Sequence, residues 1–147
     1  MSKHILCFGD SNTWGSIPGT RQRHPRNVRW TGILQKMLGE DYFVIEEGCN
    51  GRTTMWDDPV EGYKNGETYL MPCLWSHRPV DMVVLMLGTN DLKMRFSIPA
   101  ADIARCVGNL SKIIMKSEAG PGDGAPKLLI VCPPKLTLLT EHAEVFE

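Results

Sequence analysis

The chain has 147 residues, a length that suits one domain with a hydrophobic core and leaves too little for two. Its 16 Lys and Arg residues nearly balance its 17 Asp and Glu residues, so no net positive field attracts nucleic acid or an anionic membrane. A local basic cluster lacks interleaved aromatic residues, and we expect a solvated loop there: Arg21, Arg23, Arg26 and Arg29. We therefore expect neither a nucleic-acid partner nor a membrane partner.

The apolar runs are too short to act as export or membrane signals. The N-terminal run at residues 5–8 is cut off by Gly9 and Asp10, and the longest run, residues 82–87, has the length of a strand. The five cysteines are an odd number without close pairs, which is typical of small buried residues in a reducing compartment. Neither the cysteines nor the histidines have metal-ligand spacing. We expect a cytoplasmic protein with no metal and no cofactor.

Four short, continuous apolar runs predict strands that are buried on both faces of a parallel sheet: residues 5–8, 43–45, 82–87 and 128–132. An apolar stripe at helical spacing lies between the first two runs, and Gly39 follows it as a terminator: Trp30, Ile33, Leu34, Met37 and Leu38. A second stripe lies between the last two runs, and we expect Gly120 to end that helix: Ile103, Val107, Leu110 and Ile114. Leu70, Cys73 and Leu74 predict a shorter helix with Pro72 near its first turn.

Alternating strands and helices of these lengths predict a three-layer α/β/α sandwich with a doubly wound parallel sheet of the flavodoxin type. In such sheets the ligand lies outside the carboxyl ends of the strands. We therefore expect the four loops that follow the strands to meet in space: residues 9–15, 48–54, 88–93 and 133–136.

Ser11 lies where the first predicted strand turns into a helix. A serine at such a turn has an exposed hydroxyl and a free backbone N–H, the two groups that acyl transfer requires. The alternative is an ordinary N-capping serine, which needs no chemistry. The next two loops offer further donors, because Gly51 allows close backbone approach and Asn90 carries an amide. Taken alone, Gly51 and Asn90 would each be interpreted as a common turn residue. Together, at successive strand ends, they indicate one oxyanion site.

Several blocks in the same order resemble the SGNH (GDSL-type) ester hydrolases, and most closely their bacterial arylesterase/acyltransferase branch. The resemblance runs from Ile5 to about Pro134. It rests on these blocks: Phe8-Gly9-Asp10-Ser11-Asn12-Thr13-Trp14-Gly15, Arg29-Trp30-Thr31-Gly32, Glu46-Glu47-Gly48, Arg52-Thr53-Thr54, Asp57-Asp58-Pro59, Asn65-Gly66 and Met86-Leu87-Gly88-Thr89-Asn90-Asp91-Leu92-Lys93.

The resemblance implies that Ser11 is the nucleophile and that an oxyanion hole forms from the N–H of Ser11, the N–H of Gly51 and the amide of Asn90. Gly48 is the alternative to Gly51. We place two more residues on the substrate side of the site. Asp10 would hold the nucleophile turn through backbone hydrogen bonds, and Trp14 would border the pocket or pack the loop against the sheet. We expect Asp57 and Asp58 to be turn residues.

The family also carries an Asp-x-x-His segment after a fifth strand, and no such segment occurs in this chain. Of the four histidines, His4 begins a strand at the wrong end of the sheet, His24 lies among arginines and His77 ends a helix. His142 lies on the correct side and is the candidate substitute base. We expect residues 1–147 to form a single SGNH domain that is incomplete at its C-terminus, without the fifth strand and last helix.

These patterns predict a serine ester hydrolase or acyltransferase that acts on short-chain acyl or aryl esters through an acyl-enzyme at Ser11. Without the histidine we expect low activity, since the oxyanion hole alone supplies roughly 10³–10⁴-fold catalysis in a related system. The alternative is a non-catalytic binding or interaction module on the same scaffold. A phosphate cradle at residues 9–15 is disfavoured, because the loop lacks P-loop glycines and lysine. The expected partner is a small-molecule ester, and the sequence allows a homo-oligomer.

Overall fold

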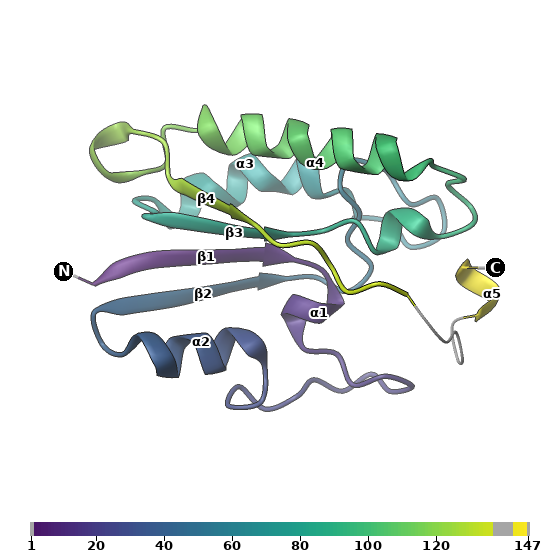
Figure 1. Cartoon of the computed structure of the whole chain (residues 1–147), viewed down its shortest axis with the longest axis horizontal. Coiled ribbons are helices and arrows are strands. Elements are labelled where there is room, and N and C mark those ends of the chain that lie inside the picture. Colours follow the sequence, from purple (N-terminus) through teal and green to yellow (C-terminus); the bar gives the residue numbers. More distant parts are fainter. Residues whose placement is uncertain (1, 137–142, 147) are drawn as a thin grey trace.

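The computed structural model describes residues 2–136 and 143–146, which form a four-stranded sheet with helices on both faces (Figure 1). The strands are β1 (Lys3–Gly9), β2 (Tyr42–Gly48), β3 (Met82–Met86) and β4 (Lys127–Ile130). Their order is β2-β1-β3-β4, and each neighbouring pair is parallel. The doubly wound α/β fold predicted from the alternating pattern is confirmed.

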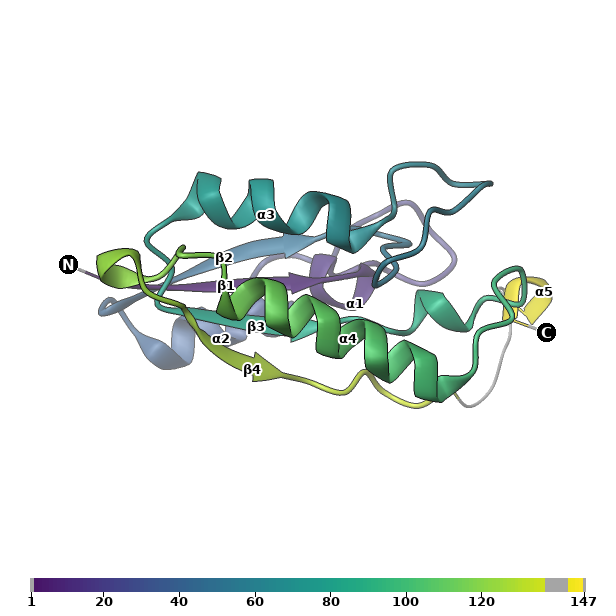
Figure 2. The ribbon, with the colours of Figure 1, turned by 90° about the horizontal axis from the view of Figure 1, so that it is seen from above.

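The helices lie on opposite faces of the sheet (Figure 2). Helix α2 (Trp30–Leu38) covers one face, and α3 (Gly66–His77) and α4 (Ala100–Met115) cover the other. Strand β1 contributes to both cores because its side chains alternate. Leu6 and Phe8 pack in the cluster under α3 and α4, whereas Ile5 and Cys7 pack in the cluster under α2.

Two helix ends depart from the sequence prediction. Helix α2 ends at Gly39 as predicted, with a φ of 75° that favours glycine. Helix α4 instead ends before Lys116, whose N–H bonds the carbonyls of Ile113 and Ile114, so the prediction that Gly120 ends it is wrong. Pro72 lies inside α3 and not in its first turn, because the helix already begins at Gly66.

Helix α3 starts early because Asn65 caps it. The Asn65 side chain accepts hydrogen bonds from the N–H groups of Glu67 and Thr68, which the first helical turn leaves without partners. A proline in mid-helix removes one hydrogen bond. Leu70, Cys73 and Leu74 are nevertheless buried on both sides of it, and this packing holds the helix together.

The basic cluster is more structured than a solvated loop. Arg23, Arg26 and Arg29 approach one oxygen of Glu46, at 3.6, 4.0 and 2.9 Å. The hydroxyl of Thr31 also hydrogen-bonds Glu46. These contacts tie the segment before α2 to the end of β2, whereas the exposed Arg21 has no such partner among the described residues.

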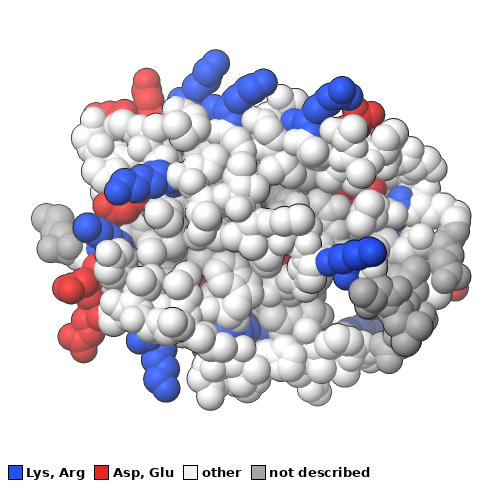
Figure 3. All heavy atoms as spheres, in the orientation of Figure 1, with Lys and Arg blue, Asp and Glu red and all other residues white. Residues whose placement is uncertain are grey.

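Charged side chains of both signs lie around the margin of the face in Figure 3, and the middle of that face is uncharged. In the described part of the chain, no helix combines the length and the apolar character that a membrane crossing requires.

Strand β4 lies at the end of the sheet order, with Leu129 and Ile130 about half exposed.

Candidate active site

A cavity of about 540 Å³ lies beyond the carboxyl ends of the strands. All four predicted loops contribute to it, which confirms that they meet in space: Ser11, Asn50, Gly51, Thr89, Asn90, Pro134, Lys135 and Leu136 are among its lining residues. Val145 and Phe146 of the short helix α5 (Ala143–Phe146) line it as well. The edge of the sheet where ligands bind in doubly wound folds therefore carries a formed cavity.

Ser11 is the first residue of the short helix α1 (Ser11–Trp14), and Asp10 is its N-cap. The Asp10 carboxylate accepts a hydrogen bond of 2.9 Å from the N–H of Asn12. The interpretation of Ser11 as an N-cap is therefore wrong. No hydrogen bond from the N–H of Ser11 is found among the described residues, so this donor is available to a ligand.

The turn that carries Ser11 is packed closely against the sheet. A Cβ at Gly9 would lie 2.1 Å from the hydroxyl oxygen of Thr13, and a Cβ at Gly48 would lie 2.2 Å from the backbone nitrogen of Trp14. Only glycine fits at either place. Gly48 therefore serves the packing of α1 against β2.

Gly51, in contrast to Gly48, lines the cavity. Its φ is 78°, a left-handed conformation that L side chains rarely adopt. Within the described ranges, the backbone N–H of Gly51 donates no hydrogen bond. Of the two glycines that the sequence offered as oxyanion donors, the geometry therefore favours Gly51.

Asn90 begins the 3₁₀ helix η1 (Asn90–Leu92) directly after β3 and lies beside the two preceding loops. Its amide nitrogen donates a 3.1 Å hydrogen bond to the carbonyl of Arg52 and lies 3.5 Å from a carboxylate oxygen of Asp10. An amide has two N–H donors, and the contact at 3.5 Å is weak. One donor is therefore engaged in fixing the amide, and the other has little competition for a ligand.

Asp10 and Trp14 do not line this cavity in the described part of the chain. Asp10 is fully buried, and burial raises the pKa of its carboxyl above 3.8. The guanidinium of Arg23 lies 5.2 Å from the centre of the Trp14 ring, and its Nε donates to the Trp14 carbonyl at 2.6 Å. Their contact with a substrate therefore stays a prediction. Asp10 holds the turn, and Trp14 packs the loop.

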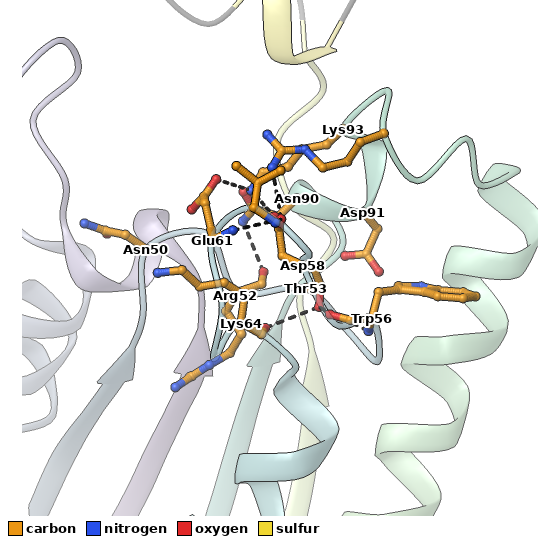
Figure 4. A network of polar contacts seen from close by, with 12 residues as sticks. Asn50, Arg52, Thr53, Trp56, Asp58, Glu61, Lys64, Asn90, Asp91 and Lys93 are labelled. Atoms are coloured by element: carbon orange, nitrogen blue, oxygen red, sulfur yellow. Dashed lines mark hydrogen bonds and ion pairs between the residues drawn. The ribbon is translucent and has the colours of Figure 1, made fainter.

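An ionic network that the sequence did not predict lies beside the cavity, with the buried Asp58 and Lys93 at its centre (Figure 4). The ammonium of Lys93 lies 3.1 Å from Asp58 and 2.7 Å from Glu61, and Arg95 donates to Asp58 at 2.9 Å. Lys93 and Glu61 both line the cavity. Asp58 is a turn residue, as expected, but it also pairs with two cations 35 and 37 residues away. The sequence carried no signal for that pairing beyond the presence of the charges.

Three hydrogen bonds and the charge of Lys93 determine the ionisation of Asp58. Burial acts to raise the pKa of its carboxyl, but hydrogen bonds from the N–H groups of Val60 and Glu61 and from Lys93 outweigh burial and lower that pKa to about 2. Asp58 is therefore ionised at neutral pH, and it balances the charge of Lys93.

None of the histidines in the described ranges lines the cavity of Ser11. His4 is on β1 at the opposite end of the sheet, and the N–H of His24 bonds the carbonyl of Gly15. His77 Nε2 lies 2.7 Å from Glu47 Oε1. His142, the candidate substitute base, lies outside the described residues.

Within the described ranges, one group of side chains has a metal-like arrangement: Glu47, Cys73 and His77, whose ligand atoms lie within 4.8 Å of one another. Such donors suit Zn²⁺. However, burial raises the pKa of the Cys73 thiol to about 12, and Glu47 already accepts a hydrogen bond from Tyr69 and pairs with His77. These contacts join the end of β2 to α3 and explain the cluster without an ion.

Several solved structures of esterases are similar to this chain. The aryl esterase of M. smegmatis in its inhibitor-bound form is 44% identical, with a TM-score of 0.94 over 99% of this chain and 72% of that chain. Est24, a carbohydrate acetylesterase from Sinorhizobium meliloti, is 41% identical, with a TM-score of 0.93 over 99% of this chain and 71% of that chain. No protein of curated function matches the sequence.

The sequence also matches a family model over most of its length. Residues 7–144 fit the GDSL-like Lipase/Acylhydrolase family, and the matched range includes Ser11, Gly51 and Asn90. The fold, the position of the cavity and the similar esterases agree with this match. The chain belongs to the GDSL-like lipase/acylhydrolase family, that is, to the SGNH carboxylic ester hydrolases.

Proposed function

We propose that this chain hydrolyses short-chain acyl or aryl esters, or transfers their acyl group, through an acyl-enzyme at Ser11. One observation carries the proposal: Ser11, Gly51 and Asn90, from three separate loops, line one cavity. The similarity to an aryl esterase and to a carbohydrate acetylesterase supports the same class of substrate. The cavity volume of about 540 Å³ is within the range of small-molecule sites.

The proposed reaction begins with attack of the Ser11 hydroxyl oxygen on the ester carbonyl carbon. A C–O bond forms, the serine proton passes to water, and the carbonyl oxygen becomes an oxyanion. The N–H groups of Ser11 and Gly51 and the amide of Asn90 then donate to that oxyanion, a stabilisation that is strongest in the transition state. Collapse of the intermediate breaks the bond to the alcohol, which leaves with a proton. Water or a second alcohol releases the acyl group from Ser11 in the same way.

The test is hydrolysis of p-nitrophenyl acetate by the purified chain, with Ser11→Ala as the inactive variant. Ser111→Ala is the matched control, because among the described residues the hydroxyl of Ser111 donates to the carbonyl of Val107 within α4 and lies outside the cavity. We expect turnover to exceed that of Ser11→Ala, and Ser111→Ala to behave as the wild type. Intact mass after mixing should show one acetyl group added to the wild type and none added to Ser11→Ala.

A non-catalytic binding module is the second candidate. This candidate is favoured because no histidine in the described ranges lines the cavity and because the sequence has no Asp-x-x-His segment. Turnover equal to that of Ser11→Ala, without acetylation, would reject the ester hydrolase for this chain. Saturable binding of phenyl acetate under those conditions, measured by calorimetry, would support the binding module.

A further inference from the structure

Three polar residues of the loop after β3 bind the loop after β2: Asn90, Asp91 and Lys93. Asn90 donates to the carbonyl of Arg52 at 3.1 Å. The Asp91 carboxylate accepts two kinds of hydrogen bond from Thr54. The backbone N–H of Thr54 donates at 3.1 Å, and the Thr54 hydroxyl donates as well. The third residue, Lys93, reaches the acids of the ionic network. The loops after β2 and β3, which carry the proposed oxyanion donors Gly51 and Asn90, are therefore joined by the side chains of three residues.

Asp91 is the most deeply placed of these links. It is fully buried, it does not line the cavity of Ser11, and burial raises the pKa of its carboxyl. A buried carboxylate is costly unless hydrogen bonds compensate. In the described part of the chain the side-chain partner of Asp91 is Thr54, which supplies both donors. The Asp91–Thr54 contact is thus a specific clip between two loops.

The clip lies close to both proposed donors. Asp91 follows Asn90 directly, and Thr54 lies three residues after Gly51. Gly51 has a φ of 78° and no side chain to hold it, so its N–H is directed by its neighbours. An oxyanion hole works only when its donors are fixed before the charge develops, since a donor that must reorganise contributes less to the transition state.

We propose that Asp91 is a positioning residue that, through Thr54, fixes the Gly51 N–H relative to the Asn90 amide. This inference rests on the proposed function of Ser11 and names the device that holds its oxyanion hole together. Loss of the clip then weakens transition-state stabilisation and leaves ground-state binding nearly unchanged.

The test compares kcat and KM for p-nitrophenyl acetate in Asp91→Ala, Asp91→Asn and Thr54→Val. We expect kcat to fall by about tenfold or more in Asp91→Ala with KM changed less than about twofold, which is the signature of an interaction made in the transition state. Asp91→Asn keeps one acceptor oxygen and should recover part of kcat. Thr54→Val removes one donor at constant shape and should also lower kcat. Asp102→Ala, at an exposed carboxylate on α4, is the control and should retain wild-type kinetics.

A second readout does not depend on turnover. Hydrogen exchange of the amides at residues 52–54 should speed up in Asp91→Ala and in Thr54→Val, while the amides of β1 exchange as in the wild type. Unchanged exchange at residues 52–54, or a rise in KM with kcat unchanged, would overturn the positioning role. If the wild type turns over no faster than Ser11→Ala, the proposed function fails, and the exchange rates alone decide whether Asp91 holds the loop.

Discussion

Asp58→Asn is the substitution whose effect can be worked out most fully from the structure. The Asp58 side chain has no solvent exposure and accepts hydrogen bonds from Lys93, Arg95 and the N–H groups of Val60 and Glu61. Asparagine has nearly the same shape but no charge. The substitution therefore removes the ionic part of these contacts and leaves the ammonium of Lys93 with Glu61 as its remaining acid.

The pKa of Asp58 sets the magnitude. The carboxyl pKa falls from 3.8 to about 2 on folding, and each pKa unit corresponds to about 1.4 kcal/mol, so the ionised carboxylate contributes about 2 kcal/mol to the free energy of unfolding. Because the folded-state pKa is the lower one, this contribution is fully present above pH 3.8. It is lost as the pH falls through about 2. A buried cation that loses one partner adds to the cost.

The assay is urea unfolding at pH 7, 5, 4, 3 and 2.5, followed by tryptophan fluorescence. We expect Asp58→Asn to be less stable than the wild type by about 2–4 kcal/mol at pH 7, and the difference to shrink below pH 4. Asp57→Asn is the matched control at the exposed neighbouring residue, and we expect less than about 0.5 kcal/mol there. A difference for Asp58→Asn that is below about 0.5 kcal/mol, or that does not change with pH, would refute the reasoning.

Two further substitutions test the packing that positions the site. Leu110→Ala removes a fully buried side chain from the core under α4 and should lower the free energy of unfolding by about 2–5 kcal/mol in urea titration. A loss below about 1 kcal/mol would contradict that packing. Gly48→Ala places a Cβ against the backbone of Trp14, so α1 must shift, and both thermal stability and acetylation of Ser11 should fall. Wild-type acetylation in Gly48→Ala would show that the close approach of α1 to β2 is not needed.

The strands and the main helices could be predicted because their signals are local. A buried parallel strand is a continuous apolar run, and an amphipathic helix repeats its apolar residues every three to four positions. Gly39 ends α2 as predicted because a left-handed residue directly after the last turn is a local requirement. The motif around Ser11 could likewise be placed at a strand end, since β1 stops at Gly9.

Other features required tertiary structure. Asp10 and Ser11 are adjacent, and both are good N-cap residues, so only the backbone could show that Asp10 caps α1 and leaves Ser11 free. Pro72 sits in mid-helix because buried neighbours compensate for its missing N–H, which no local propensity predicts. Only the folded chain shows that Arg23 lies over the Trp14 ring, because the two residues are nine positions apart.

Whether a feature could be predicted from the sequence depends on how far apart in the chain its residues lie. The sequence by itself determined the strand and helix pattern, the fold class and the three polar loops, because each of these depends on residues within about one or two turns of one another. Tertiary structure alone decided which charges pair, as with Lys93 and Asp58, and which of two glycines lines the cavity. Such contacts join segments tens of residues apart, and their energies depend on burial, which arises only when the chain has folded.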